Sequence, residues 1–309
     1  MQTASLSILK TLAYYNIFNY PLTREEINSM MDGSYSENEI ADAFQILEKD
    51  GLIFFIDGFY SLYNTPFLIQ RRKKGNEKAI GQLRTAVKVA RLLARFPYVR
   101  GVAISGSLSK NFADEESDID FFIITVKDRL WIARTFMHLF KKLTYLVGKQ
   151  HWVCMNYYLD EGGLELKEKN IFTAIEAITA MPLHGDAAFK NFVAANDWIK
   201  KYFPKRSTDL SGTKRMRKGV IKPMIEFIFN NRIGNWLNGR LMKITVSRWQ
   251  KKTELKKRNR RGILLGMDAD EHYCKPDPRY FQQKVVTQFN LKMEQLMMQS
   301  EPLPKVKAV

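Results

Sequence analysis

The sequence predicts an α+β protein in three parts: a small domain of three helices and a hairpin, a mixed β-sheet with flanking helices, and a helical C-terminal region. Helical and then alternating apolar patterns fill the first 66 residues. Two short buried strands enclose a turn near residue 106, and helical spacing with strong positive charge dominates the C-terminal third. The expected domains cover residues 1–66, 67–185 and 186–309.

The first domain is expected to contain helices at Ser5–Tyr15, after the cap residue Thr23, and at Ser36–Asp50. Asp57-Gly58, the preferred two-residue hairpin turn, lies between two apolar strands. Three helices and a hairpin resemble a winged-helix domain. Its third helix carries five acidic residues against one lysine, so it would repel phosphates, and we expect a protein-contact or structural role rather than DNA binding.

The second part is expected to carry a metal site on two adjacent strands, 102–105 and 121–125. Residues two apart on a strand point to the same face, so Asp118 and Asp120 can present two carboxylates side by side while Ile119 turns into the core. Two carboxylates held that close repel each other, and a divalent cation relieves the repulsion. Mg²⁺ commonly binds one or two carboxylates together with phosphate oxygens. The pattern therefore suggests a phosphorylated substrate.

Gly106 and Ser107 fit the phosphate half of such a substrate. Glycine lets the backbone approach a phosphate closely, while the serine hydroxyl and nearby N–H groups can donate to its oxygens. Lys110 adds a positive charge nearby. An ordinary turn with a capping aspartate is the alternative, but the conjunction of strand, Gly-Ser, Ser-Asp-x-Asp and strand favours function. Arg134, on a helix after the second strand, is a further phosphate-contact candidate, with a surface arginine as the alternative.

The segment GSLSKNFADEESDID resembles the nucleotidyltransferase superfamily related to DNA polymerase beta, in its small bacterial form. The resemblance implies that Gly106 and Ser107 hold a triphosphate and that Asp118 and Asp120 bind Mg²⁺ or Mn²⁺. Lys110 stands where many members have an arginine. The implied reaction moves a nucleoside monophosphate from an NTP, expected to be ATP, to a hydroxyl of RNA, protein or a small molecule, and releases pyrophosphate.

Members of the superfamily usually supply a third carboxylate from a later strand, and this sequence departs from that pattern. The expected strand, His151–Leu159, carries Asn156 at its middle. An amide can bind a metal through its oxygen but cannot act as a general base near neutral pH. Asp160 and Glu161 follow at the strand end and are alternatives if the register differs.

The excess positive charge is concentrated in the third part of the chain. Residues 200–261 hold twenty Lys or Arg and three acidic residues, which accounts for the whole net charge of +17. Basic runs occur at 214–218 and 256–261, and Phe227, Phe229, Trp236 and Trp249 are interleaved. Core packing, nucleic-acid binding and contact with an anionic membrane surface all remain open for this region.

Two distant cysteines and four histidines form no zinc pattern, and no apolar stretch approaches a membrane span. We therefore expect reduced thiols and a cytoplasmic protein without a transmembrane segment. The tail, 300–309, is expected to be disordered. Two further functions stay open beside the transferase. One is a catalytically weak or inactive nucleotide-binding module, and the other is a nucleic-acid-binding regulator that uses the basic region.

Overall fold

The computed structural model describes residues 3–115, 117–146, 148, 150–216, 221–258, 266–276 and 281–300. The chain forms two compact units, each assembled from segments that are distant in the sequence. Parts of both basic runs, Arg217, Lys218 and residues 259–261, lie outside the described residues, as does the tail from 301.

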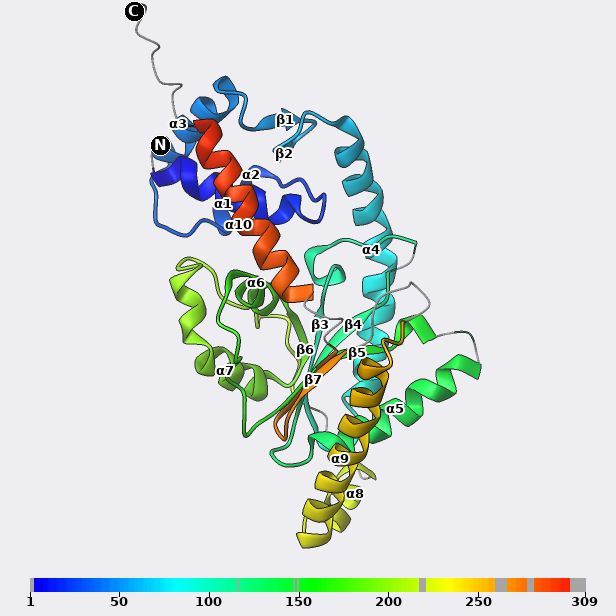
Figure 1. Cartoon of the computed structure of the whole chain (residues 1–309). Coiled ribbons are helices and arrows are strands. Elements are labelled where there is room, and N and C mark those ends of the chain that lie inside the picture. Colours follow the sequence, from blue (N-terminus) through cyan, green and yellow to red (C-terminus); the bar gives the residue numbers. More distant parts are fainter. Residues whose placement is uncertain are drawn as a thin grey trace, which may run out of the picture. The chain divides into compact units, whose positions relative to one another are not determined.

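One unit consists of Met1–Lys74, Trp198–Ser207 and Gln282–Val309. It contains α1 (Thr3–Asn16), α2 (Arg24–Ser29), α3 (Glu37–Lys49), β1 (Phe54–Ile56), β2 (Phe59–Ser61), the start of α4 (Pro66–Leu93), and nearly all of α10 (Phe281–Ser300). The helices α1, α2 and α3 and the antiparallel hairpin occur where the sequence predicts them (Figure 1). The winged-helix assignment stays a prediction.

Local sequence explains the elements of this unit. Thr23 and Ser36 each form a capping box with the glutamate three residues later, Glu26 and Glu39, which satisfies backbone N–H groups at the starts of α2 and α3. Asp57 and Gly58 both have positive φ, 51° and 88°, as a tight hairpin turn requires. The C-terminal α10 completes the core, with the ring of Phe289 6.4 Å from that of Tyr14.

The other unit consists of Gly75–Asp197 and Thr208–Phe281 and is built on a six-stranded mixed sheet. In spatial order the strands are β6 (Met181–His184), β3 (Val99–Ser105), β4 (Asp120–Thr125), β5 (Cys154–Asp160), β8 (Tyr273–Pro276) and β7 (Met267–Ala269). The pair β4–β5 is parallel and the other pairs are antiparallel. The fold is α+β, as predicted.

Helices cover both faces of this sheet (Figure 1). The remaining helices of the unit are α5 (Leu130–Leu146), α6 (Ile171–Thr179), α7 (Asp186–Ala195), α8 (Ile221–Phe229) and α9 (Arg232–Glu254), with short 3₁₀ turns at Leu108–Lys110 and Gln150–Trp152. Phe121 packs into a core with Trp131 of α5 and Leu93 of α4. Its neighbour Phe122 faces α7, with its ring 5.1 Å from that of Phe192. The alternation of a strand thus places α4 and α5 on one face and α7 on the other.

The C-terminal region is less uniformly helical than the sequence predicts, because β7 and β8 extend the sheet beyond β5. These two strands belong to residues 186–309, which the sequence analysis separated from the catalytic domain. The expected domain boundary near residue 185 stays a prediction. None of the helices in the described part of the chain is both long enough and apolar enough to cross a membrane.

Candidate active site

The turn after β3 brings its backbone against the side chain of Asp120. Ser105, the last residue of β3, pairs with Asp120, the first of β4. Gly106 has φ +69°, and a Cβ atom added to it would lie 2.7 Å from Asp120 Oδ2. Position 106 therefore requires glycine for two reasons, the left-handed backbone and the close approach of a carboxylate.

Lys110 is held at the same turn. Its Nζ donates a hydrogen bond to Gly106 O at 3.1 Å and forms an ion pair with Glu176 Oε1 of α6 at 2.7 Å. The lysine side chain is only 14% exposed. Ser107 is exposed beside it, so the turn presents a hydroxyl and an ammonium group together. The sequence analysis missed Glu176, which lies 56 residues beyond Asp120 and in no recognisable motif.

Asp120 is surrounded by other carboxylates. Burial raises the pKa of Asp120 to about 7, and the negative charges of Asp118 and Glu176 act in the same direction. Ile119 is buried in the sheet core, as predicted, which leaves Asp118 and Asp120 on either side of it. His151 Nδ1 lies within hydrogen-bonding distance of Asp118 Oδ1.

The strand expected to supply a third ligand is β5, and its register places Cys154 rather than Asn156 beside Asp120. Phe121 pairs with Met155 and Phe122 with Tyr157, so Asn156 is the extra residue of a bulge. Burial and the charge of Asp120 raise the pKa of Cys154 to about 12, so its thiol stays protonated and can donate to the carboxylate.

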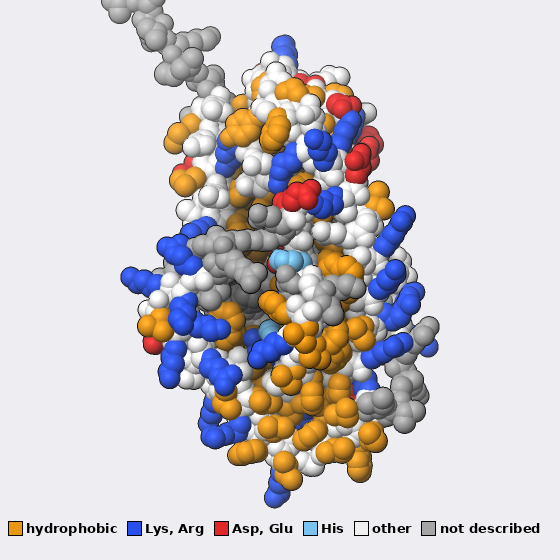
Figure 2. All heavy atoms as spheres, turned by 90° about the vertical axis from the view of Figure 1, so that its right-hand side faces the viewer, with side chains coloured by type: hydrophobic (Ala, Val, Ile, Leu, Met, Phe, Trp, Pro, Cys, Tyr) orange, Lys and Arg blue, Asp and Glu red, His pale blue; other side chains and the backbone are white. Residues whose placement is uncertain are grey.

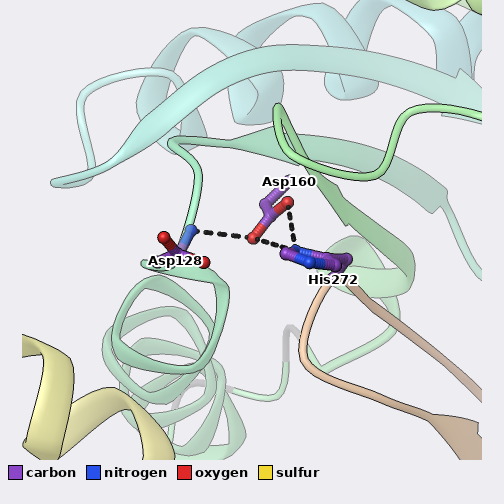
Figure 3. A group of neighbouring side chains, drawn as sticks. All are labelled: Asp128, Asp160 and His272. Carbon is purple, nitrogen blue, oxygen red and sulfur yellow. Dashed lines mark hydrogen bonds and ion pairs between the residues drawn. The ribbon is translucent and has the colours of Figure 1, made fainter.

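Asp160 lies at the other end of the same strand pair, where it pairs with Thr125. It is fully buried and accepts hydrogen bonds from the backbone N–H groups of Asp128 at 2.9 Å and Gly162 at 2.8 Å. His272 Nδ1, from the turn between β7 and β8, lies 3.0 Å from Oδ1 (Figure 3). Asp120 and Asp160 thus belong to two separate groups, and the structure does not bring Asp160 to the Gly106 turn.

Two sets of side chains could therefore hold a cation. Asp128, Asp160 and His272 have potential ligand atoms within 4.8 Å of one another. However, both oxygens of Asp160 already accept hydrogen bonds from backbone N–H groups, that of Asp128 (Figure 3) and that of Gly162. Asp118 and Asp120 face further negative charge instead, and a carboxylate whose pKa is raised among like charges fits a divalent cation better.

The segment around the Gly106 turn is similar to a known protein family. Residues 87–172 match a family model described as a nucleotidyltransferase domain. The matched residues include the end of α4, β3, the Gly106 turn, β4, α5 and β5, but end before Glu176. No curated protein and no solved structure is similar enough to the chain to give a match. The family match supports nucleotidyl transfer in general and, with it, an NTP substrate.

Proposed function

We propose that the sheet unit transfers a nucleoside monophosphate from an NTP to an acceptor hydroxyl and releases pyrophosphate. The observation that carries this proposal is the contact between the Gly106 turn and Asp120, where an added Cβ would meet Oδ2 at 2.7 Å. Such a turn can place phosphate oxygens next to carboxylates only if a cation lies between them. The family match at residues 87–172 supports the same reaction.

Each residue of the site has a distinct role in this proposal. Backbone N–H groups at Gly106-Ser107, the Ser107 hydroxyl and the Lys110 ammonium bind the triphosphate. Asp118 and Asp120 hold Mg²⁺ or Mn²⁺. The bound ion supplies positive charge to the phosphate oxygens. His151 orients Asp118, and the Cys154 thiol donates to Asp120.

Glu176 takes the place of the third carboxylate in our proposal, instead of Asn156 or Asp160. It lies at the turn through its ion pair with Lys110, and its charge contributes to the raised pKa of Asp120. When a triphosphate binds Lys110, Glu176 loses part of its pairing and would become available to complete the cation site.

A second candidate is a nucleotide-binding module without chemistry. The observation that favours it is the β4–β5 register, which places a protonated thiol beside Asp120 where the family usually has a carboxylate. The remaining proposals are a winged-helix domain in residues 1–66, ATP as the NTP, and a cytoplasmic location.

The test uses α-³²P-labelled NTPs with Mg²⁺ in cell extract, followed by separation of protein, RNA and small molecules. We expect label in one fraction with the wild type and a loss of at least about 10³-fold with Asp120→Asn, because several kcal/mol of charge stabilisation disappears. Asp128→Asn is the matched control, since it changes an exposed aspartate after the other end of β4.

Three results separate the alternatives. Full activity of Asp120→Asn overturns the proposed site. Loss of activity in Asp128→Asn alone moves the metal centre to the Asp128, Asp160 and His272 group. Binding of NTP without label in any fraction favours the non-catalytic module.

A further inference from the structure

A positively charged pocket lies between α5 and α9, apart from the Gly106 turn. Its volume is about 330 Å³, and four of its lining side chains are basic: Arg134 and Lys142 from α5, Arg248 and Lys252 from α9. No aspartate or glutamate occurs among the described residues that line it. Four cations that converge without a carboxylate repel each other, so the pocket is suited to an anion.

Arg134 is the most deeply recessed basic residue of the pocket wall. The residue is only 8% exposed, and its buried Nε has no hydrogen-bond partner in the described structure. It is therefore not the surface arginine that was the alternative in the sequence analysis. The same guanidinium is hydrogen-bonded to the Cys274 side chain and lies 5.6 Å from the centre of the Trp131 ring, so the protein holds its positive charge in place at the pocket wall.

The pocket is a built feature rather than a chance gap between helices. On α9, Thr245, Arg248, Trp249 and Lys252 follow helical spacing and form one face, and Thr135, His138, Leu139 and Lys142 do the same on α5. Asn238 Oδ1 of α9 accepts hydrogen bonds from the backbone N–H groups of Trp131, at 3.0 Å, and Ile132. This contact fixes the two helices against each other.

The pocket also offers an aromatic surface. Trp249 is partly exposed, and Lys252 Nζ lies 4.8 Å from the centre of its ring. An aromatic face next to several cations is the combination that binds a base and its phosphate. Burial, together with the charges of Arg134, Lys141 and Lys142, lowers the pKa of His138 to about 3, so this ring is neutral and can donate or accept a hydrogen bond.

The last turns of α5 connect the pocket to the proposed active site. Lys142 lines the pocket, and the preceding residue, Lys141, is close enough to Asp120 for its positive charge to lower the pKa of that carboxyl. A nucleic-acid backbone that runs along α5 from the Gly106 turn would therefore reach the pocket.

We propose that the α5–α9 pocket binds a nucleotide unit of a single-stranded nucleic acid, which is the acceptor for the transfer. This inference rests on the proposed function. A second possible occupant is an anionic membrane, because Phe227, Ile233 and Trp236 of the neighbouring surface are more than 60% exposed. Figure 2 shows apolar side chains gathered in its lower part, where α8 and α9 lie, with Lys and Arg at the margins. The recessed position of Arg134, in a pocket between two helices, favours a nucleic-acid phosphate over a flat surface.

The test is fluorescence anisotropy of labelled single-stranded RNA and DNA oligonucleotides with the full chain, without Mg²⁺ or NTP. The pocket variant is Arg248→Ala/Lys252→Ala, and the matched control is Arg240→Ala/Lys251→Ala. Each removes one arginine and one lysine from exposed positions on α9, and each includes a cation that lies over a tryptophan ring. The control residues do not line the pocket.

We expect the pocket variant to weaken binding at least about tenfold more than the control, because charge-assisted contacts are lost. The slope of log K against log salt should fall by about 1.4, or about 0.7 for each lost phosphate contact. Trp249→Ala should weaken binding at least about fivefold and Trp236→Ala less than about twofold, because only the former removes a stacking platform in the pocket.

Equal weakening in the pocket and control variants would show diffuse electrostatic attraction and would overturn the inference. Unchanged oligonucleotide binding, together with weaker sedimentation on vesicles that contain anionic lipid, would also overturn it and assign the surface to a membrane. Preference for RNA or for DNA identifies the acceptor within the proposed class. Failure of the label-transfer test overturns the proposed function, and the binding result does not depend on that test.

Discussion

An aspartate lies at each end of the paired strands β4 and β5, Asp120 partly exposed and Asp160 fully buried, and the protein surrounds the two with different groups. Asp160 pairs with Thr125, accepts hydrogen bonds from two backbone N–H groups and faces His272. Asp120, paired with Cys154, faces the negative charges of Asp118 and Glu176 and has a pKa of about 7. Burial raises the pKa of both carboxyls.

The comparison shows that burial alone does not identify a functional carboxylate. A buried carboxylate that the protein surrounds with donors holds elements together, since its removal leaves those donors unsatisfied. One that the protein surrounds with other carboxylates needs a cation from solution to be stable in its charged form. Asp160 belongs to the first class and Asp120 to the second.

The largest effect on stability is expected at Asp160. We predict that Asp160→Ala lowers the free energy of unfolding by about 3–5 kcal/mol, because it leaves two buried N–H groups and His272 without their partner. Urea denaturation of the variant and of Asp128→Asn measures this, because asparagine tolerates the positive φ of 58° at position 128. The control keeps the backbone N–H group that donates a hydrogen bond to Asp160, so its free energy of unfolding should change little. Equal, small losses in both variants would remove the contrast between the two aspartates.

The next effect concerns Asp120 and depends on pH. Its pKa is raised from 3.8 in the unfolded chain to about 7, so ionisation opposes folding, and this contribution to stability falls as pH rises from about 4 to 7. At pH 8 with a chelator, Asp120→Asn should be more stable than the wild type by about 2 kcal/mol. Each unit of pKa shift corresponds to about 1.4 kcal/mol of unfolding free energy. We expect about half of the value for the full pKa shift, because solvent screens a partly exposed side chain.

At pH 4 the stabilities of Asp120→Asn and the wild type should converge. Mg²⁺ at pH 8 should stabilise the wild type and not the variant, because the ion binds the ionised carboxylate. Thermal denaturation at the two pH values, with and without Mg²⁺, measures both effects. A variant that is less stable than the wild type at pH 8 would place Asp120 in the same class as Asp160.

The smallest effect is expected at Glu176. Glu176→Gln should weaken the apparent affinity for Mg²⁺ about tenfold in nucleotide-dependent binding or turnover, because a neighbouring carboxylate is lost. Glu165→Gln is the control, since it also removes a glutamate that pairs with a lysine, Lys169. A change in the affinity for NTP with unaltered Mg²⁺ dependence would limit Glu176 to orienting Lys110.

The contiguous features could be predicted from the sequence. The two strands around the Gly106 turn, the inward position of Ile119, the caps at Thr23 and Ser36, and the Asp57-Gly58 hairpin all depend on neighbours within a few residues. Local rules of backbone geometry and side-chain alternation suffice for such features.

The partners of Asp120 could not be predicted in the same way. A one-residue bulge at Asn156 shifts the register of β5, and sequence periodicity does not reveal it. Glu176 reaches the Gly106 turn from α6, a helix that is distant from the turn in the sequence. The strands β7 and β8 have only three and four residues, which is too short for a clear alternating pattern. Tertiary packing decides each of these positions.

The division of the chain between the two units also affects the order in which the protein folds during synthesis. The unit that contains α1 is completed by α10, through the contact of Tyr14 with Phe289 and the hydrogen bond from Lys292 to Tyr63. On the ribosome these contacts can therefore form only after α10 has emerged. The sheet unit, which ends at Phe281, emerges before its neighbour is complete.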